Sequence, residues 1–119
     1  MRIAFRGVFL TSENPEKTAR FYQQVAALPI EKIGAEGQYT YWRVDDNGMQ
    51  LAIHDAKLFA EYTHPALADS NLTHLYFKIE DQGVFLRHLE NLGISSLSVD
   101  DVVVTVVDPD GRKVMFGTA

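Results

Sequence analysis

The sequence predicts an α+β fold made of two copies of one β-α-β-β-β module, and three observations carry that prediction. The turn sequence Asp45-Asp46-Asn47-Gly48 recurs as Asp108-Pro109-Asp110-Gly111, and each turn is followed by alternating apolar residues, a pattern typical of a β-hairpin. Upstream of each hairpin, an apolar strand leads into an amphipathic helix that begins after Asn14 or Asp81. With 119 residues in total, neither module is large enough to bury a core alone, so the two should pack together.

Length, net charge and residue composition limit the classes of function that the chain can have. We expect one domain over residues 1–119, with modules at about 1–55 and 72–119 joined by a connector at 56–71. The formal net charge of -5 and the lack of a basic cluster argue against nucleic acid as a partner. The sequence has no cysteine, which excludes disulfides, thiolate metal sites and a cysteine nucleophile. No apolar run approaches membrane-spanning length, so a cytoplasmic protein without membrane partners is expected.

The residues that begin and end a helix locate the elements of the first module. Asn14 is a good N-cap residue and Pro15 suits the first helical position. The helix is expected to run from Pro15 to about Leu28, because Pro29 blocks its continuation. Alternation and turn residues place strands at 3–10, 30–33, 39–44 and 49–54.

The second module repeats this order. A short helix at 56–62 and the connector lead to a strand whose apolar residues alternate from Leu75 to Ile79. Asp81 is the expected N-cap of the next helix and Gly93 its expected end. Further strands are expected at 94–98, 102–107 and 113–117.

The paired modules, the N-P-E-K-x-x-x-F-Y helix start at 14–22 and the D-P-D-G hairpin at 108–116 resemble the vicinal oxygen chelate superfamily. This group contains glyoxalase I, bleomycin-resistance proteins and extradiol dioxygenases. The resemblance covers the whole chain. It implies an eight-stranded, open, barrel-like pair of sheets around a cleft, and a homodimer.

Enzymes of this superfamily hold a divalent metal on up to four side chains, taken from the first and last strand of each module. In this sequence those positions fall at Gly7, Ala52, His74 and Met115. Only His74 can coordinate a hard or borderline divalent ion. Because a catalytic metal needs about three protein ligands, we expect no metal cofactor, and whether the chain is an enzyme is left open.

Strand alternation predicts the lining of the cleft. Residues two apart on a strand share a face, and aromatic and cationic side chains recur at this spacing. A planar or amphipathic small molecule would suit such a lining through stacking, cation–π contacts and a salt link. The expected ligand-binding residues are Phe9, Tyr39, Tyr41, Arg43, Gln50, His54, His74, Tyr76, Lys78 and Met115.

The residues leave alternatives open. His74 is either a catalytic acid or base or a polar lining residue, and His54 either joins the cleft or is a surface residue at a strand end. The leading hypothesis is a metal-independent binding protein of the bleomycin-resistance type. The first alternative is a glyoxalase-like lyase, isomerase or dioxygenase with a nonstandard divalent metal site formed by His74, His54 and Gln50. The second is a protein-interaction module whose cleft is filled by side chains.

Overall fold

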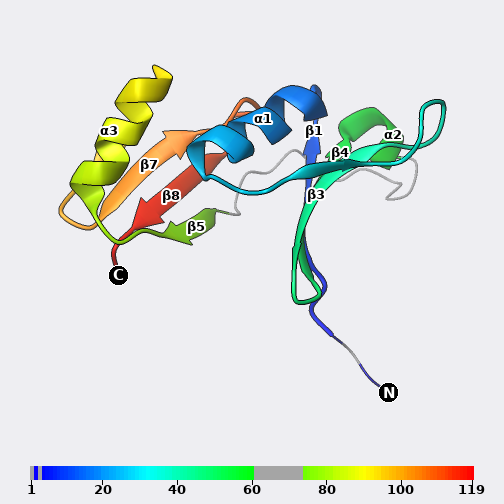
Figure 1. Cartoon of the computed structure of the whole chain (residues 1–119), viewed down its shortest axis with the longest axis horizontal. Coiled ribbons are helices and arrows are strands. Elements are labelled where there is room, and N and C mark those ends of the chain that lie inside the picture. The colour runs from blue at the N-terminus through cyan, green and yellow to red at the C-terminus, as the bar shows by residue number, and fades with distance from the viewer. Residues whose placement is uncertain (1, 3, 61–73) are drawn as a thin grey trace.

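The computed structural model describes residues 2, 4–60 and 74–119 and contains two four-stranded mixed sheets, each covered on one face by a helix (Figure 1). The two sheets have the same internal strand order: the first strand of each module pairs with the fourth, the fourth with the third, and the third with the second. The predicted duplication of a β-α-β-β-β module is therefore confirmed.

Sheet A, the sheet of the first module, has the order β1-β4-β3-β2. β1 pairs with β4 in parallel, and the other two pairs are antiparallel. A short helix, α2 (Ala56–Ala60), follows β4 directly. The strands are β1 (Gly7–Ser12), β2 (Glu31–Ile33), β3 (Tyr41–Asp46) and β4 (Met49–Asp55).

Sheet B, the sheet of the second module, has the order β5-β8-β7-β6, again with one parallel pair and two antiparallel pairs. β8 covers the predicted residues, and β7 begins one residue later than expected. The strands are β5 (Leu75–Lys78), β6 (Ser98–Val99), β7 (Val103–Val107) and β8 (Lys113–Gly117).

The helix caps are those that the sequence predicts. In α1 (Pro15–Val25), the Asn14 side chain accepts a hydrogen bond from the Lys17 N–H at 3.2 Å. In α3 (Gln82–Leu92), Asp81 accepts from the Val84 N–H at 2.9 Å. Gly93 ends α3 in the left-handed conformation with φ 69°, which glycine adopts without a steric penalty.

Several element boundaries differ from the prediction. β1 begins at Gly7 instead of residue 3, because its partner β4 begins only at Met49. α1 ends at Val25, three residues early, because Ala27 turns left-handed (φ 52°) before Pro29. β6 is a two-residue edge strand at Ser98–Val99, which overlaps the predicted strand at 94–98 only at Ser98. The β3–β4 hairpin has a two-residue turn instead of four, since Asp46 pairs with Met49. The expected connector residues 61–71 lie outside the described residues.

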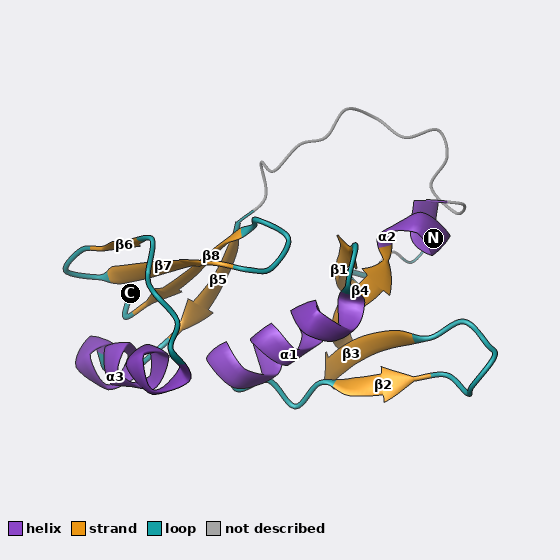
Figure 2. Ribbon diagram, turned by 90° about the horizontal axis from the view of Figure 1, so that it is seen from above, coloured by secondary structure: helices purple, strands orange, loops and turns teal. Residues whose placement is uncertain are grey.

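α1 lies between the two sheets in both ribbon views (Figures 1 and 2). Tyr22 and Val25 of this helix are almost fully buried. They belong to one continuous core that also contains Ile53 from sheet A and Phe116 from sheet B, with Phe85 from α3. A single core shared by two half-sized modules is what the length of the chain requires.

A group of polar contacts, which we call the Asp108 clasp, joins α1 to the β7–β8 turn. The buried carboxylate of Asp108 accepts from the Tyr22 hydroxyl at 2.7 Å and from Arg112 Nη1 at 2.9 Å. Its other oxygen accepts from the backbone N–H groups of Asp110 and Arg112. Thr18 of α1 donates to Asp110, and Arg112 also donates to the Thr11 carbonyl at the end of β1.

The clasp affects the protonation of two of its members. Burial raises the pKa of the Tyr22 hydroxyl, and the neighbouring Asp108 carboxylate raises it further. Burial alone would raise the pKa of Asp110, but hydrogen bonds from Thr18, Ser12 and the Glu13 backbone, with the charge of Arg112, lower it overall. The repeated aspartates are therefore turn residues, as the sequence indicates, and those of the second copy also fasten the two modules together.

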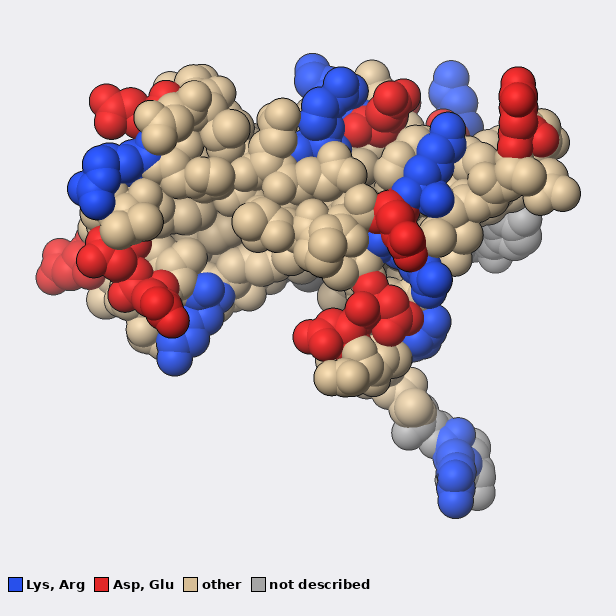
Figure 3. All heavy atoms as spheres, viewed as in Figure 1, with Lys and Arg blue, Asp and Glu red and all other residues tan. Residues whose placement is uncertain are grey.

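None of the helices in the described part of the chain is both long and apolar enough to cross a membrane. Acidic and basic side chains are interspersed over the face seen in Figure 3, without a continuous basic patch on that face. The radius of gyration is 15.5 Å, against about 13.5 Å for a compact domain of this length. The chain is therefore less compact than such a domain, and its two sheets do not close on each other.

Candidate ligand-binding site

The open face of sheet A, opposite α1, carries the candidate site. Along β4 the side chains alternate, so that Leu51 and Ile53 pack into the core while Gln50, Ala52 and His54 point the other way. The antiparallel register places Arg43 of β3 opposite Ala52. The two-residue turn shifts this register by two residues from the expected one, which keeps every side chain on the predicted face.

Four aromatic rings gather around the His54 imidazole at the α2 end of this face. The Tyr41 ring stacks on the imidazole with centroids 4.8 Å apart and planes at 7°. Phe59 of α2 lies at 4.6 Å and Phe9 of β1 at 5.1 Å from it. The Tyr39 hydroxyl forms a hydrogen bond of 2.7 Å with Nδ1 of His54. These residues, which we call the His54 ring cluster, come from β1, β4, α2, β3 and the loop before β3.

His54 is only 7% exposed, and burial lowers its pKa below the ordinary value for histidine. The imidazole is thus held neutral around pH 7. Its Nε2 atom is buried and has no hydrogen-bond partner within the described part of the chain. A buried polar atom without a partner is uncommon in proteins and is costly unless a ligand or water satisfies it.

Two arginines occupy the hairpin end of the same face. With the Gln50 amide oriented to satisfy both, its oxygen accepts from Arg6 Nη2 at 2.7 Å and from Arg43 Nη1 at 3.1 Å. Arg43 also lies 3.5 Å from Asp45 and 3.9 Å from Glu31. A hydrogen bond from the Gly48 backbone lowers the pKa of Asp45, as do Gln50 and the two arginines.

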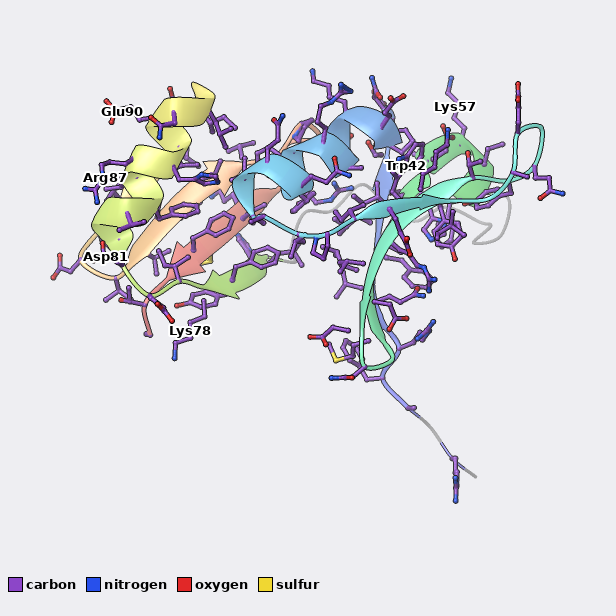
Figure 4. All side chains as sticks on the ribbon, in the orientation of Figure 1. Trp42, Lys57, Lys78, Asp81, Arg87 and Glu90 are labelled. Atoms are coloured by element: carbon purple, nitrogen blue, oxygen red, sulfur yellow. The ribbon has the colours of Figure 1, made fainter. Side chains whose placement is uncertain are left out.

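The other predicted lining residues lie on sheet B. Tyr76 and Lys78 are on the exposed face of β5, and Met115 is on the same face of β8. His74 directly precedes β5 and is exposed. Figure 4 shows Lys78 projecting from the outer side of β5. The structure thus brings together the six predicted residues of the first module and separates them from the four of the second.

A groove of about 490 Å³ between α1 and α3 is a second candidate, lined by Val84, Phe85 and His88 among others. Its histidine is already satisfied, because Nε2 of His88 donates to the Gln24 carbonyl at 2.7 Å. On the open face of sheet A, by contrast, Nε2 of His54 is buried and has no hydrogen-bond partner among the described residues.

Comparison with known proteins gives matches to solved structures. No family model matches the sequence, and no curated protein matches it. An integron cassette protein from the mobile metagenome of Vibrio cholerae aligns with a TM-score of 0.71 at 18% identity, over 98% of this chain and 95% of that one. Lactoylglutathione lyase from Agrobacterium tumefaciens aligns with a TM-score of 0.69 at 18% identity, over 98% and 94%. A glyoxalase/bleomycin resistance protein/dioxygenase from Nocardioides aligns with a TM-score of 0.71 at 19% identity, over 98% and 83%.

This chain has a glyoxalase-like two-module fold. The matches cover nearly the whole of this chain and most of each neighbour, and they share its two-module architecture. At these identities the likeness establishes the fold, and the activity must be argued from the residues of this chain.

The metal positions of the vicinal oxygen chelate fold can be tested against this geometry. At Gly7 the backbone has φ 147°, and a Cβ atom built there would lie 1.9 Å from the Gln50 carbonyl oxygen. A side chain of any kind is therefore blocked at this position unless the strands move. Ala52 is fully buried beneath the open face and offers no ligand atom. Among the described residues, no group of three or more His, Cys, Asp or Glu could hold a metal ion, so the donor set does not fit the metal.

Sequence reasoning missed two members of the site. Phe59 was placed in a short helix, and its ring reaches His54 only because α2 follows β4 without a linker. Arg6 was placed inside a strand, but it precedes β1, and the parallel register puts its neighbour Gly7 opposite Gln50. A pairing register for β1 and β4 would have revealed Arg6, and a single sequence does not provide one.

Proposed function

We propose that the protein binds a planar aromatic or amphipathic small molecule on the open face of sheet A, without a metal. The observation that carries the proposal is the His54 ring cluster, which presents stacked rings beside a buried, unpartnered imidazole nitrogen. Phe9 is 46% exposed on this face, so part of its ring is open to contact with a ligand. Apolar surface with a few fixed polar groups is the usual character of a small-molecule site.

A binding role agrees better with the residues than a metal-dependent lyase, isomerase or dioxygenase does. The metal-dependent alternative needs His54, Gln50 and His74 on one ion. His54 and Gln50 share a face of β4, whereas His74 precedes a strand of the other sheet. The homodimer expected from the resemblance stays a prediction.

Calorimetric titration with 2-naphthol, a neutral planar aromatic probe, tests the proposal. We expect saturable binding, and we expect Tyr41→Ala to weaken it by about fivefold, since one aromatic contact contributes on the order of 1 kcal/mol. Phe5→Ala is the matched control, because Phe5 is also an exposed aromatic (69%) but lies before β1, outside the ring cluster. Absence of saturable binding, or an equal loss in both variants, would contradict the proposal.

A further inference from the structure

We propose that the ligand of this site is an aromatic carboxylate whose carboxylate group accepts hydrogen bonds from both His54 and Arg43. The inference rests on the proposed function and adds the charge and the anchoring group of the ligand. Two buried nitrogen atoms of the described chain have no hydrogen-bond partner, namely Nε2 of His54 and Nε of Arg43. Both belong to the open face of sheet A.

The two side chains are close enough to share one ligand group. Arg43 is paired in register with Ala52, and His54 lies two residues farther along β4 on the same face. Diagonal neighbours on adjacent antiparallel strands are about 7 to 8 Å apart at the backbone, which long side chains can span. Ala52 has only a methyl group, so no side chain from β4 fills the space between them.

The chemistry of Arg43 favours an acceptor. Its terminal nitrogens already face Asp45, Glu31 and the Gln50 oxygen. The remaining nitrogen, Nε, carries a proton in the guanidinium and can only donate. A ligand that satisfies it must therefore bring an oxygen or another acceptor atom, and a carboxylate is the geometric match for guanidinium donors.

His54 becomes a donor through its contact with Tyr39. A neutral imidazole carries one proton, and the hydrogen bond at Nδ1 decides which nitrogen holds it. When the Tyr39 hydroxyl donates to Nδ1, the proton is on Nε2, and that atom donates to the ligand. A carboxylate selects this tautomer, since it accepts from Nε2–H.

The rings explain why the acid should be aromatic. Tyr41 and Phe9 border the imidazole, and Phe9 is still half exposed. A planar ring attached to the carboxylate would cover this apolar surface while its oxygens reach the two nitrogens. A cationic ligand would instead face the guanidinium of Arg43 and leave both donors unpaired.

The test compares two probes of the same shape, 2-naphthoate and the neutral 2-naphthamide, by calorimetric titration of the full chain at pH 7. We expect 2-naphthoate to bind at least about tenfold more tightly, as charge-assisted hydrogen bonds are stronger than neutral ones. In Arg43→Gln and in His54→Phe, the ratio of the 2-naphthoate affinity to the 2-naphthamide affinity should fall toward one. Arg87→Gln is the charge-matched control, because Arg87 is exposed on α3 in the other module (Figure 4). It should keep the preference of the wild type.

The outcomes separate the two proposals. Equal or tighter binding of 2-naphthamide, with the Tyr41 dependence of 2-naphthol intact, would overturn the carboxylate anchor and leave the aromatic site standing. The carboxylate anchor would also be overturned if Arg43→Gln and His54→Phe both kept the wild-type preference for 2-naphthoate over 2-naphthamide. Binding of none of the three probes would contradict the proposed function itself. Retained binding of 2-naphthamide by the variants shows that they fold.

Discussion

Asp108→Ala is expected to lower the free energy of unfolding by about 3 to 5 kcal/mol, the range for removing one partner of a buried, hydrogen-bonded ion pair. The Asp108 side chain is 0% exposed. It accepts from the Tyr22 hydroxyl, from the Arg112 guanidinium and from two backbone N–H groups. The substitution leaves these donors unpaired and releases the link between α1 and sheet B. Urea denaturation followed by circular dichroism measures the change.

Asp46→Ala is the control for the clasp. Asp46 occupies the corresponding hairpin of the first module, but its side chain is exposed and does not face the helix of another module. Its loss should change the free energy of unfolding by less than about 0.5 kcal/mol. If Asp108→Ala costs no more than this control, the clasp does not hold the modules together.

Gly7→Ala is expected to destabilise the protein by about 2 to 4 kcal/mol, because it combines a strained backbone angle with a steric clash. The added Cβ would lie 1.9 Å from the Gln50 carbonyl oxygen, and the φ of 147° disfavours any L side chain. The same obstacle would face a metal ligand introduced at this position. Thermal and urea unfolding of the variant measure the loss.

Gly48→Ala separates the cost of the backbone angle from the cost of the steric clash. Gly48 also has a positive φ, 91°, but nothing lies within 4 Å of a Cβ placed there. It should cost only about 1 to 2 kcal/mol, the penalty for the left-handed backbone alone. Equal losses at Gly7 and Gly48 would mean that β1 moves freely away from β4, and the steric part of the account would be wrong.

The repeat made the fold predictable. Turn residues such as Gly111 and cap residues such as Asn14 and Asp81 act through local hydrogen bonds and backbone preferences, and these are encoded within a few residues. The recurrence of the same signals then predicted two equivalent sheets. The short edge strand β6 was placed too early and made too long, because a single sequence does not show which residues pair with β7.

The candidate site was predictable on one sheet only. Alternation alone placed Tyr41, Arg43 and His54 on one face, and the two-residue shift of the hairpin left that face unchanged. The same rule placed Tyr76 and Met115 on one face of the other sheet. How the two faces are oriented depends on the packing of α1 and on the Asp108 clasp, which join residues about a hundred positions apart.

The unusual feature of this chain is a glyoxalase-like fold in which the backbone blocks any side chain at Gly7, a position where the family resemblance implies a metal ligand. Gly7 is sterically blocked, and Ala52 lies beneath Arg43 on the open face. In place of a ligand set, the face presents aromatic rings and two unpaired nitrogen donors. The proposed site would hold a planar ligand through these groups, without a metal.

Metal content tests the central claim most directly. Tag-free protein would be dialysed separately against Zn, Ni, Mn and Fe(II), freed of unbound ions, and analysed by inductively coupled plasma mass spectrometry. The account predicts metal at background level for all four ions, with 2-naphthol binding the same before and after treatment with a chelator. Near one metal per chain, or per pair of chains, would contradict it and would make His54, Gln50 and His74 the first ligands to mutate.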